Sequence, residues 1–163
     1  MSLQSLLKDS ASTNKDGKSR LRALDALILQ TNQNDEQSRM LVDGGLLKTV
    51  MEVLGKHPPS TDKCWTNDQY PEDQHPDWWL CFDILTNLCK WQSVRKDLID
   101  AKVVEFLAVL SKSEGTYFNF EATEGLSYVV GRDDQGAHSE LLRGRPKNVA
   151  FIIKVLESVL DGD

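Results

Sequence analysis

The same order of apolar side chains appears twice in this chain of 163 residues, separated by a constant 57 positions. Each copy is too short to bury its own apolar face, so a repeat of this kind predicts that neighbouring copies stack on one another. The pairs that define the spacing are Leu24 with Cys81, Leu27 with Ile84, Leu41 with Leu98, Leu46 with Val103, and Val50 with Leu107.

Within each copy the apolar residues recur with helical rather than strand periodicity. Leu24 and Leu27 lie on one helical stripe, and the stretch 46–54 forms a second. A shorter segment between them ends at Gly44-Gly45, where glycine can close a helix in the left-handed conformation. The sequence therefore predicts three helices per unit. A third copy follows at spacings of 41 to 46 residues, which places the units at about 19–56, 78–113 and 117–160.

Two segments stand outside the units. Residues 57–77 hold four of the five prolines and five acids against one base, so this stretch cannot be helical throughout and is predicted to be a long insertion loop. Residues 1–18 are predicted to be a short helix and a linker. The whole chain, 1–163, is expected to form a single all-α domain.

Charge and cysteine content exclude several classes of protein. The chain has 19 basic and 25 acidic residues, a net charge of -6, which disfavours binding to nucleic acid. Three cysteines without a CxxC pair indicate a reducing compartment, so we expect the cytoplasm, with the nucleus as the alternative. No apolar run approaches the roughly 18 residues of a membrane span, so no membrane association is expected.

Two stretches resemble armadillo repeats: RMLVDGGLLKTVMEVL at 39–54 and CFDILTNLCK at 81–90. The resemblance covers residues 19–160 and implies a right-handed α-solenoid of about three armadillo-like three-helix repeats. The long insertion departs from the family pattern, and Asp83 stands where nuclear-import adaptors carry a groove tryptophan. A shorter stretch, EATEGLSYVV at 121–130, is similar to repeats of the UCS-type myosin chaperones.

The family resemblance also implies a binding site. In armadillo proteins the long third helix of each repeat lines a concave face, and asparagine side chains there hold the backbone of an extended peptide. The matching positions, four residues apart on each helix, form the predicted groove: Gln30, then Asp83 and Asn87, then Glu124 and Tyr128. The acidic members favour a basic peptide or partner helix. The alternative is that these are solvated residues, or that Asn87 holds a neighbouring loop.

Aromatic residues surround the second long helix. Trp79 matches Phe120 in the repeat register and is expected to be packed. Trp78 and Trp91 cannot both share its face, so both are candidates for an exposed interface anchor, although core positions are the commoner use of aromatics at helical spacing.

No pattern typical of catalysis or of a cofactor site is present. His57, Cys64 and His75 have no zinc-finger spacing, so no metal is predicted. Cys81 and Cys89 lie on the apolar side of a helix, where thiols are inert packing groups. The sequence therefore predicts a non-enzymatic protein-interaction module without cofactors. A self-associating scaffold, as a homodimer or as a chaperone-like segment of a larger chain, is the alternative; a metal- or cysteine-dependent enzyme is the third hypothesis.

Overall fold

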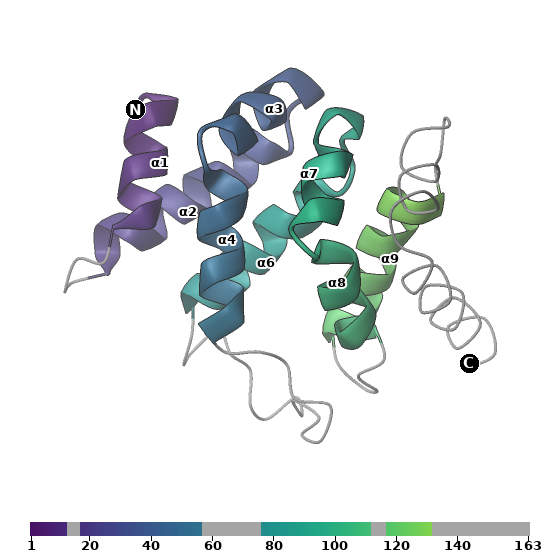
Figure 1. Ribbon diagram of the computed structural model, residues 1–163. Helices are drawn as coiled ribbons and strands as arrows, with labels where there is room; N and C mark the ends of the chain where they lie inside the picture. The colour runs from purple at the N-terminus through teal and green to yellow at the C-terminus, as the bar shows by residue number, and fades with distance from the viewer. Residues whose placement is uncertain (13–16, 57–75, 112–116, 132–163) are drawn as a thin grey trace. The chain divides into compact units, whose positions relative to one another are not determined.

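All the regular secondary structure in the described part of the chain is helical. The computed structural model describes residues 1–12, 17–56, 76–111 and 117–131, and none of these residues lies in a strand (Figure 1). The predicted all-α class is confirmed for these residues. Most of the predicted insertion loop and the end of the third unit lie outside them. The helices are α1 (Leu3–Ala11), α2 (Lys18–Thr31), α3 (Asp35–Asp43), α4 (Leu46–Lys56), α6 (Pro76–Leu88), the 3-10 helix η1 (Gln92–Val94), α7 (Arg95–Asp100), α8 (Val103–Ser111) and α9 (Tyr117–Gly131).

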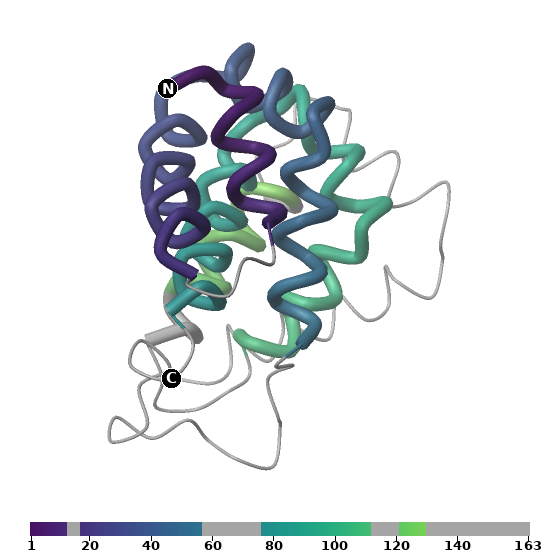
Figure 2. Tube along the Cα trace, turned by 90° about the vertical axis from the view of Figure 1, so that its left-hand side faces the viewer, coloured from purple at the N-terminus to yellow at the C-terminus, as the bar shows by residue number. Residues whose placement is uncertain are grey.

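The helices belong to two compact units. The first comprises α1, α2, α3, α4, α6 and η1, and its last residue is Val94; the second begins at Arg95 and holds α7, α8 and α9. In the first unit α2 packs against α1 and α6, and α6 also packs against α4 (Figure 2). In the second unit α8 packs against α7 and α9. The predicted single domain stays a prediction.

Short polar residues cap the start of two helices of the first unit, α1 and α3. The Ser2 hydroxyl accepts a hydrogen bond from the Ser5 backbone N–H at 3.2 Å at the start of α1. The Asn34 side chain accepts from the Gln37 N–H at 2.8 Å at the start of α3, where Asp35 also places negative charge beside the positive end of the helix dipole. Each cap satisfies a backbone donor that the helix itself leaves unpaired.

The 57-residue spacing is also present in the helix boundaries and the turns. The helix α3 followed by α4 corresponds to η1 and α7 followed by α8. In the first turn the N–H groups of Gly44 and Gly45 donate to the carbonyls of Met40 and Val42, both at 3.0 Å. In the second turn the residues 57 positions later make the same two bonds, at 2.9 and 3.1 Å. The two turns also share a left-handed residue, Gly45 with φ 96° in one and Lys102 with φ 66° in the other.

The core positions predicted from the repeat are buried. The paired residues Leu24 and Cys81, Leu27 and Ile84, and Leu41 and Leu98 are all 0% exposed. Burying one leucine side chain stabilises the fold by about 1.5–3 kcal/mol, so this shared pattern determines much of the packing. In the third unit the described positions that match are buried as well: Ala122, Leu126 and Val129.

Within residues 1–12, 17–56, 76–111 and 117–131, no helix is both long enough and apolar enough to cross a membrane.

Candidate functional site

Three of the five predicted groove residues lie on adjacent helices of the first unit. Gln30 is near the end of α2, and Asp83 and Asn87 are one turn apart on α6; all three are half-buried. We call this surface the α2–α6 face. The other two, Glu124 and Tyr128, lie on α9 in the second unit, where Glu124 is exposed and Tyr128 is half-buried.

The Asn87 amide is bonded to α2. Its Nδ2 donates to the Ile28 carbonyl at 3.0 Å and approaches the Thr31 hydroxyl oxygen at 3.4 Å. Ile28 belongs to the last turn of α2, where carbonyls have no regular partner within the helix. The Thr31 hydroxyl donates to the same carbonyl at 3.1 Å and to that of Leu27 at 2.8 Å. Asn87 therefore helps to cap the C-terminal end of α2.

Trp91 completes the cap on α2. Its indole Nε1–H donates to the Thr31 carbonyl at 2.6 Å, and the Ser38 hydroxyl donates to the same oxygen at 3.2 Å. Lys90 lies beside this end of α2, with its Nζ 3.2 Å from Asn32 Oδ1 and 3.5 Å from Asn87 Oδ1. We call this set the α2 cap: Thr31, Ser38, Asn87, Lys90 and Trp91.

The α2 cap changes the expected role of Asn87. The alternative that Asn87 holds a neighbouring segment agrees with its hydrogen bonds, and that segment is the last turn of a helix rather than a loop. If Asn87 only contacted a ligand, replacing it would leave the melting temperature unchanged. The structure instead gives the side chain a stabilising role, because its donor satisfies a carbonyl of α2.

Gln30 and Asp83 provide the remaining polar groups of the α2–α6 face. The Gln30 side-chain oxygen accepts from the Gln37 side-chain amide, and its own Nε2 has no hydrogen-bond acceptor within the described ranges. Asp83 is half-buried, and its backbone carbonyl accepts from the Thr86 hydroxyl at 3.0 Å. Gln30 is thus an available donor, and Asp83 places negative charge one turn from Asn87.

Trp78 is not an exposed anchor. It is 0% exposed, it stacks on Phe82 with ring centroids 5.5 Å apart, and its Nε1–H donates to the Leu54 carbonyl at 3.2 Å. The suggestion that Trp78 contacts a partner is therefore wrong, because an apolar ring packed between α6 and α4 offers no surface. Trp79 is packed as expected, at 6% exposed. Trp91 is half-buried within the α2 cap.

The two described cysteines are chemically quiet. Burial raises the pKa of Cys81 and of Cys89 from 9.0 to about 12; the nearby charge of Arg20 opposes the rise at Cys81, and that of Lys90 opposes it at Cys89. Both side chains are therefore neutral thiols at neutral pH, as the apolar helix face predicted. The described residues contain no group of three His, Cys, Asp or Glu side chains that could hold a metal ion. His57, Cys64 and His75 lie outside them.

Polar contacts also join α3 to η1, and the sequence did not predict them. Both the backbone N–H of Ser93, at 3.2 Å, and its hydroxyl donate to Asp35 Oδ1. Arg39 donates from Nη1 to the Ser93 carbonyl at 2.7 Å and from Nη2 to Asp43 at 2.6 Å. We call Asp35, Arg39 and Ser93 the α3–η1 junction. The spacing of Asp35 and Arg39, one turn apart on a helix, was the only available signal.

The described groups are suited to hydrogen bonding and to electrostatic selection of a partner. An amide and a carboxylate stand four residues apart on α6, a spacing at which helix side chains are neighbours. Comparison with known proteins finds neither a family model nor a curated protein that matches this chain.

Proposed function

We propose that this chain is a non-enzymatic protein-interaction module that binds an extended peptide or a partner helix on the α2–α6 face. The observation that carries the proposal is the recurrence, 57 residues apart, of the same helix boundaries, buried positions and turn hydrogen bonds. Repeated helical units bury one face on their neighbours and leave another side available along the array, and such proteins commonly use this surface for binding.

The repeat also supports an armadillo-like arrangement as part of the proposal. In that arrangement α2, α6 and α9 are the third helices of successive units, and the units stack as a right-handed solenoid. The order of a long helix, a short helix ending in a left-handed turn, and a second apolar helix agrees with the family pattern. In this proposal the third helices form the binding surface.

The chemistry of the α2–α6 face favours a basic partner. Asp83 supplies negative charge, Gln30 Nε2 can donate to a backbone carbonyl, and the chain carries a net charge of -6. Asn87 acts mainly by holding α2 beside α6; its Oδ1 lies 3.5 Å from Lys90 Nζ and has a second lone pair that can accept from a ligand. Charge on such a face raises the association rate and the selectivity more than the affinity.

A peptide library tests the proposal. We would select binders from random unstructured dodecapeptides displayed on phage, and then measure their affinity by fluorescence anisotropy. Replacing Asp83 with Asn removes one charge from the α2–α6 face, and we expect a loss of affinity of about two- to fivefold, as for one partly exposed ion pair. Asp25→Asn is the matched control, because Asp25 is an exposed acid on α2 outside the α2–α6 face. Equal effects of the two substitutions would contradict the proposed site.

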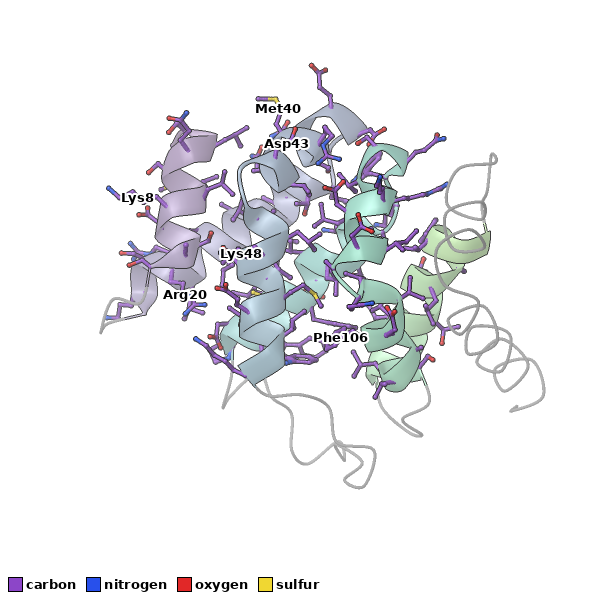
Figure 3. All side chains as sticks on the ribbon, viewed as in Figure 1. Lys8, Arg20, Met40, Asp43, Lys48 and Phe106 are labelled. Carbon is purple, nitrogen blue, oxygen red and sulfur yellow. The ribbon has the colours of Figure 1, made fainter. Side chains whose placement is uncertain are left out.

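Self-association is the second candidate, and exposed apolar side chains favour it. Leu29 on α2 is 68% exposed and Met40 on α3 is 57% exposed. The Met40 side chain points out of its helix into solvent (Figure 3). Sedimentation velocity at several protein concentrations separates this candidate from peptide binding, since a concentration-independent monomer would leave it without support.

A further inference from the structure

The α3–η1 junction joins two elements through one exposed serine. Three polar groups of Ser93 bond to α3: the N–H and the hydroxyl donate to Asp35, and the carbonyl accepts from Arg39. Ser93 is exposed, and it lies in a three-residue 3-10 helix whose last residue, Val94, is also the last residue of the first unit. Short 3-10 segments have weaker hydrogen-bond geometry than α-helices and often mark hinges. The hydrogen bonds of Ser93 to α3 can therefore open without unfolding α3, while Val94 of the same segment stays buried.

From this geometry we infer that Ser93 is a phosphorylation site whose modification opens the α3–η1 junction. The serine lies between a carboxylate and a guanidinium that are one helical turn apart. In the unmodified chain its hydroxyl donates a hydrogen bond to the carboxylate of Asp35. A phosphate monoester at this oxygen carries a charge of about -1.5 to -2 and has only acceptor oxygens. The hydroxyl bond to Asp35 would then be lost with its hydrogen, and the remaining bond from the Ser93 N–H would be opposed by repulsion between like charges.

Arg39 offers the phosphate at Ser93 a partner of opposite charge. Its Nη1 is already 2.7 Å from the Ser93 carbonyl, and its Nη2 also forms an exposed i, i+4 ion pair with Asp43. Exposed pairs of this kind contribute little to stability, whereas arginine and phosphate form strong charge-assisted hydrogen bonds. The phosphate therefore draws Arg39 away from Asp43 and moves η1 off Asp35.

The reaction requires a protein kinase and MgATP. The Ser93 Oγ bonds to the γ-phosphorus as the bond from that phosphorus to the β,γ-bridging oxygen breaks. ADP leaves, and the hydroxyl proton passes to the carboxylate base of the kinase. Lys96, which is exposed three residues after Ser93, suits a kinase that selects a basic residue on the C-terminal side.

The modification site and the switch are tested separately. The full chain is incubated with MgATP and a panel of kinases that prefer basic sequences, and labelled residues are mapped by mass spectrometry. We expect label at Ser93 and none at this position in Ser93→Ala. If a kinase labels a peptide spanning residues 88–99 but not Ser93 in the folded chain, the assignment of the site is wrong.

For the switch, phosphoserine is incorporated at position 93 during translation, and amide hydrogen exchange is measured by NMR. The Ser93 amide should exchange about tenfold faster or more than in the unmodified chain, the factor expected when a hydrogen bond to a charged group is lost. In the Asp35→Asn background, which lacks the repelling charge, phosphorylation should accelerate exchange less. Unchanged exchange at Ser93 in the phosphorylated chain would overturn the switch.

Discussion

Replacing Asn87 with Asp should destabilise the chain at neutral pH because it removes one donor from the α2 cap. The carboxylate keeps the shape of the amide but cannot donate to the Ile28 carbonyl, now 3.0 Å away. That carbonyl keeps its bond from the Thr31 hydroxyl, so the loss is that of an ordinary hydrogen bond, about 1 kcal/mol, rather than the cost of an unpaired buried group. The new charge beside the negative end of α2 adds about 0.3–1 kcal/mol, which the nearby Lys90 partly offsets. We expect a net loss of about 1–2 kcal/mol, or a melting temperature lower by about 2–8 °C.

The pH dependence of this variant has a defined sign. Next to two acceptor oxygens the new carboxyl favours its protonated form, so its pKa in the folded state lies above the unfolded value of about 3.9. Its neutral form can donate like the amide. The penalty is therefore absent below that unfolded pKa and grows as pH rises through the folded pKa. Circular dichroism melts of variant and wild type at each pH measure the difference.

Asn32→Asp is the matched control for the Asn87 variant. It places the same charge at the same end of α2, but the Asn32 side chain donates nothing to an α2 carbonyl; its Oδ1 accepts a hydrogen bond from Lys90 at 3.2 Å. This variant should show only the charge effect and keep its Lys90 contact. If Asn87→Asp melts no lower than Asn32→Asp at pH 7, the amide does not hold α2 in place.

Two further predictions concern the buried thiols and the repeated turn. Burial raises the pKa of Cys81 and Cys89 from 9.0 to about 12, so both thiols favour the folded state below pH 9 and this stabilisation is lost as pH rises toward 12. The urea midpoint of the wild type should therefore fall over this pH range more steeply than that of a Cys81→Ala, Cys89→Ala double variant. Equal slopes for the two proteins would argue against burial of the thiols. Gly45→Ala should lower the free energy of unfolding by about 0.5–1 kcal/mol through its left-handed backbone alone, since an added Cβ meets no atom within 4 Å. Lys102→Gly should be neutral or stabilising by up to about 1 kcal/mol, and Lys102→Ala, which keeps the backbone strain, is the control. If chemical denaturation gave the same sign for Gly45→Ala and Lys102→Gly, the two turns would not correspond.

The buried core could be predicted from the sequence because its apolar residues recur at one spacing of 57 positions. Leu27 and Ile84 are buried at corresponding positions, as their spacing required, and the left-handed turn was expected at the glycine pair. The second left-handed turn, at Lys102, carries no glycine and so gave no local signal. Its conformation follows only from alignment with Gly45.

Less of the candidate site than of the core could be predicted from the sequence, because hydrogen-bond partners depend on packing between helices. Helical spacing predicted that Asp83 and Asn87 lie one turn apart on the same helix, and both are on α6. It could not show that the Asn87 amide reaches a carbonyl 59 residues earlier, or that Trp91 bonds to Thr31. Nor could it find the pairing of Ser93 with Asp35, 58 residues apart. These contacts join residues with no shared periodicity, so composition and spacing carry no trace of them.

Whether a repeat position is buried or exposed depends on the helices packed around it and not on its place in the repeat. Trp79 and Phe82 on α6 and Cys89 directly after it are buried. The residues 57 positions earlier are exposed, and all three are polar: Arg22, Asp25 and Asn32. The helix α6 packs against both α2 and α4, whereas α2 presents this side to water, and the sequence changes from apolar to polar accordingly. A binding surface in this unit is thus better sought on the α2–α6 face than on the outer side of α2, where Leu29 stands alone among polar residues.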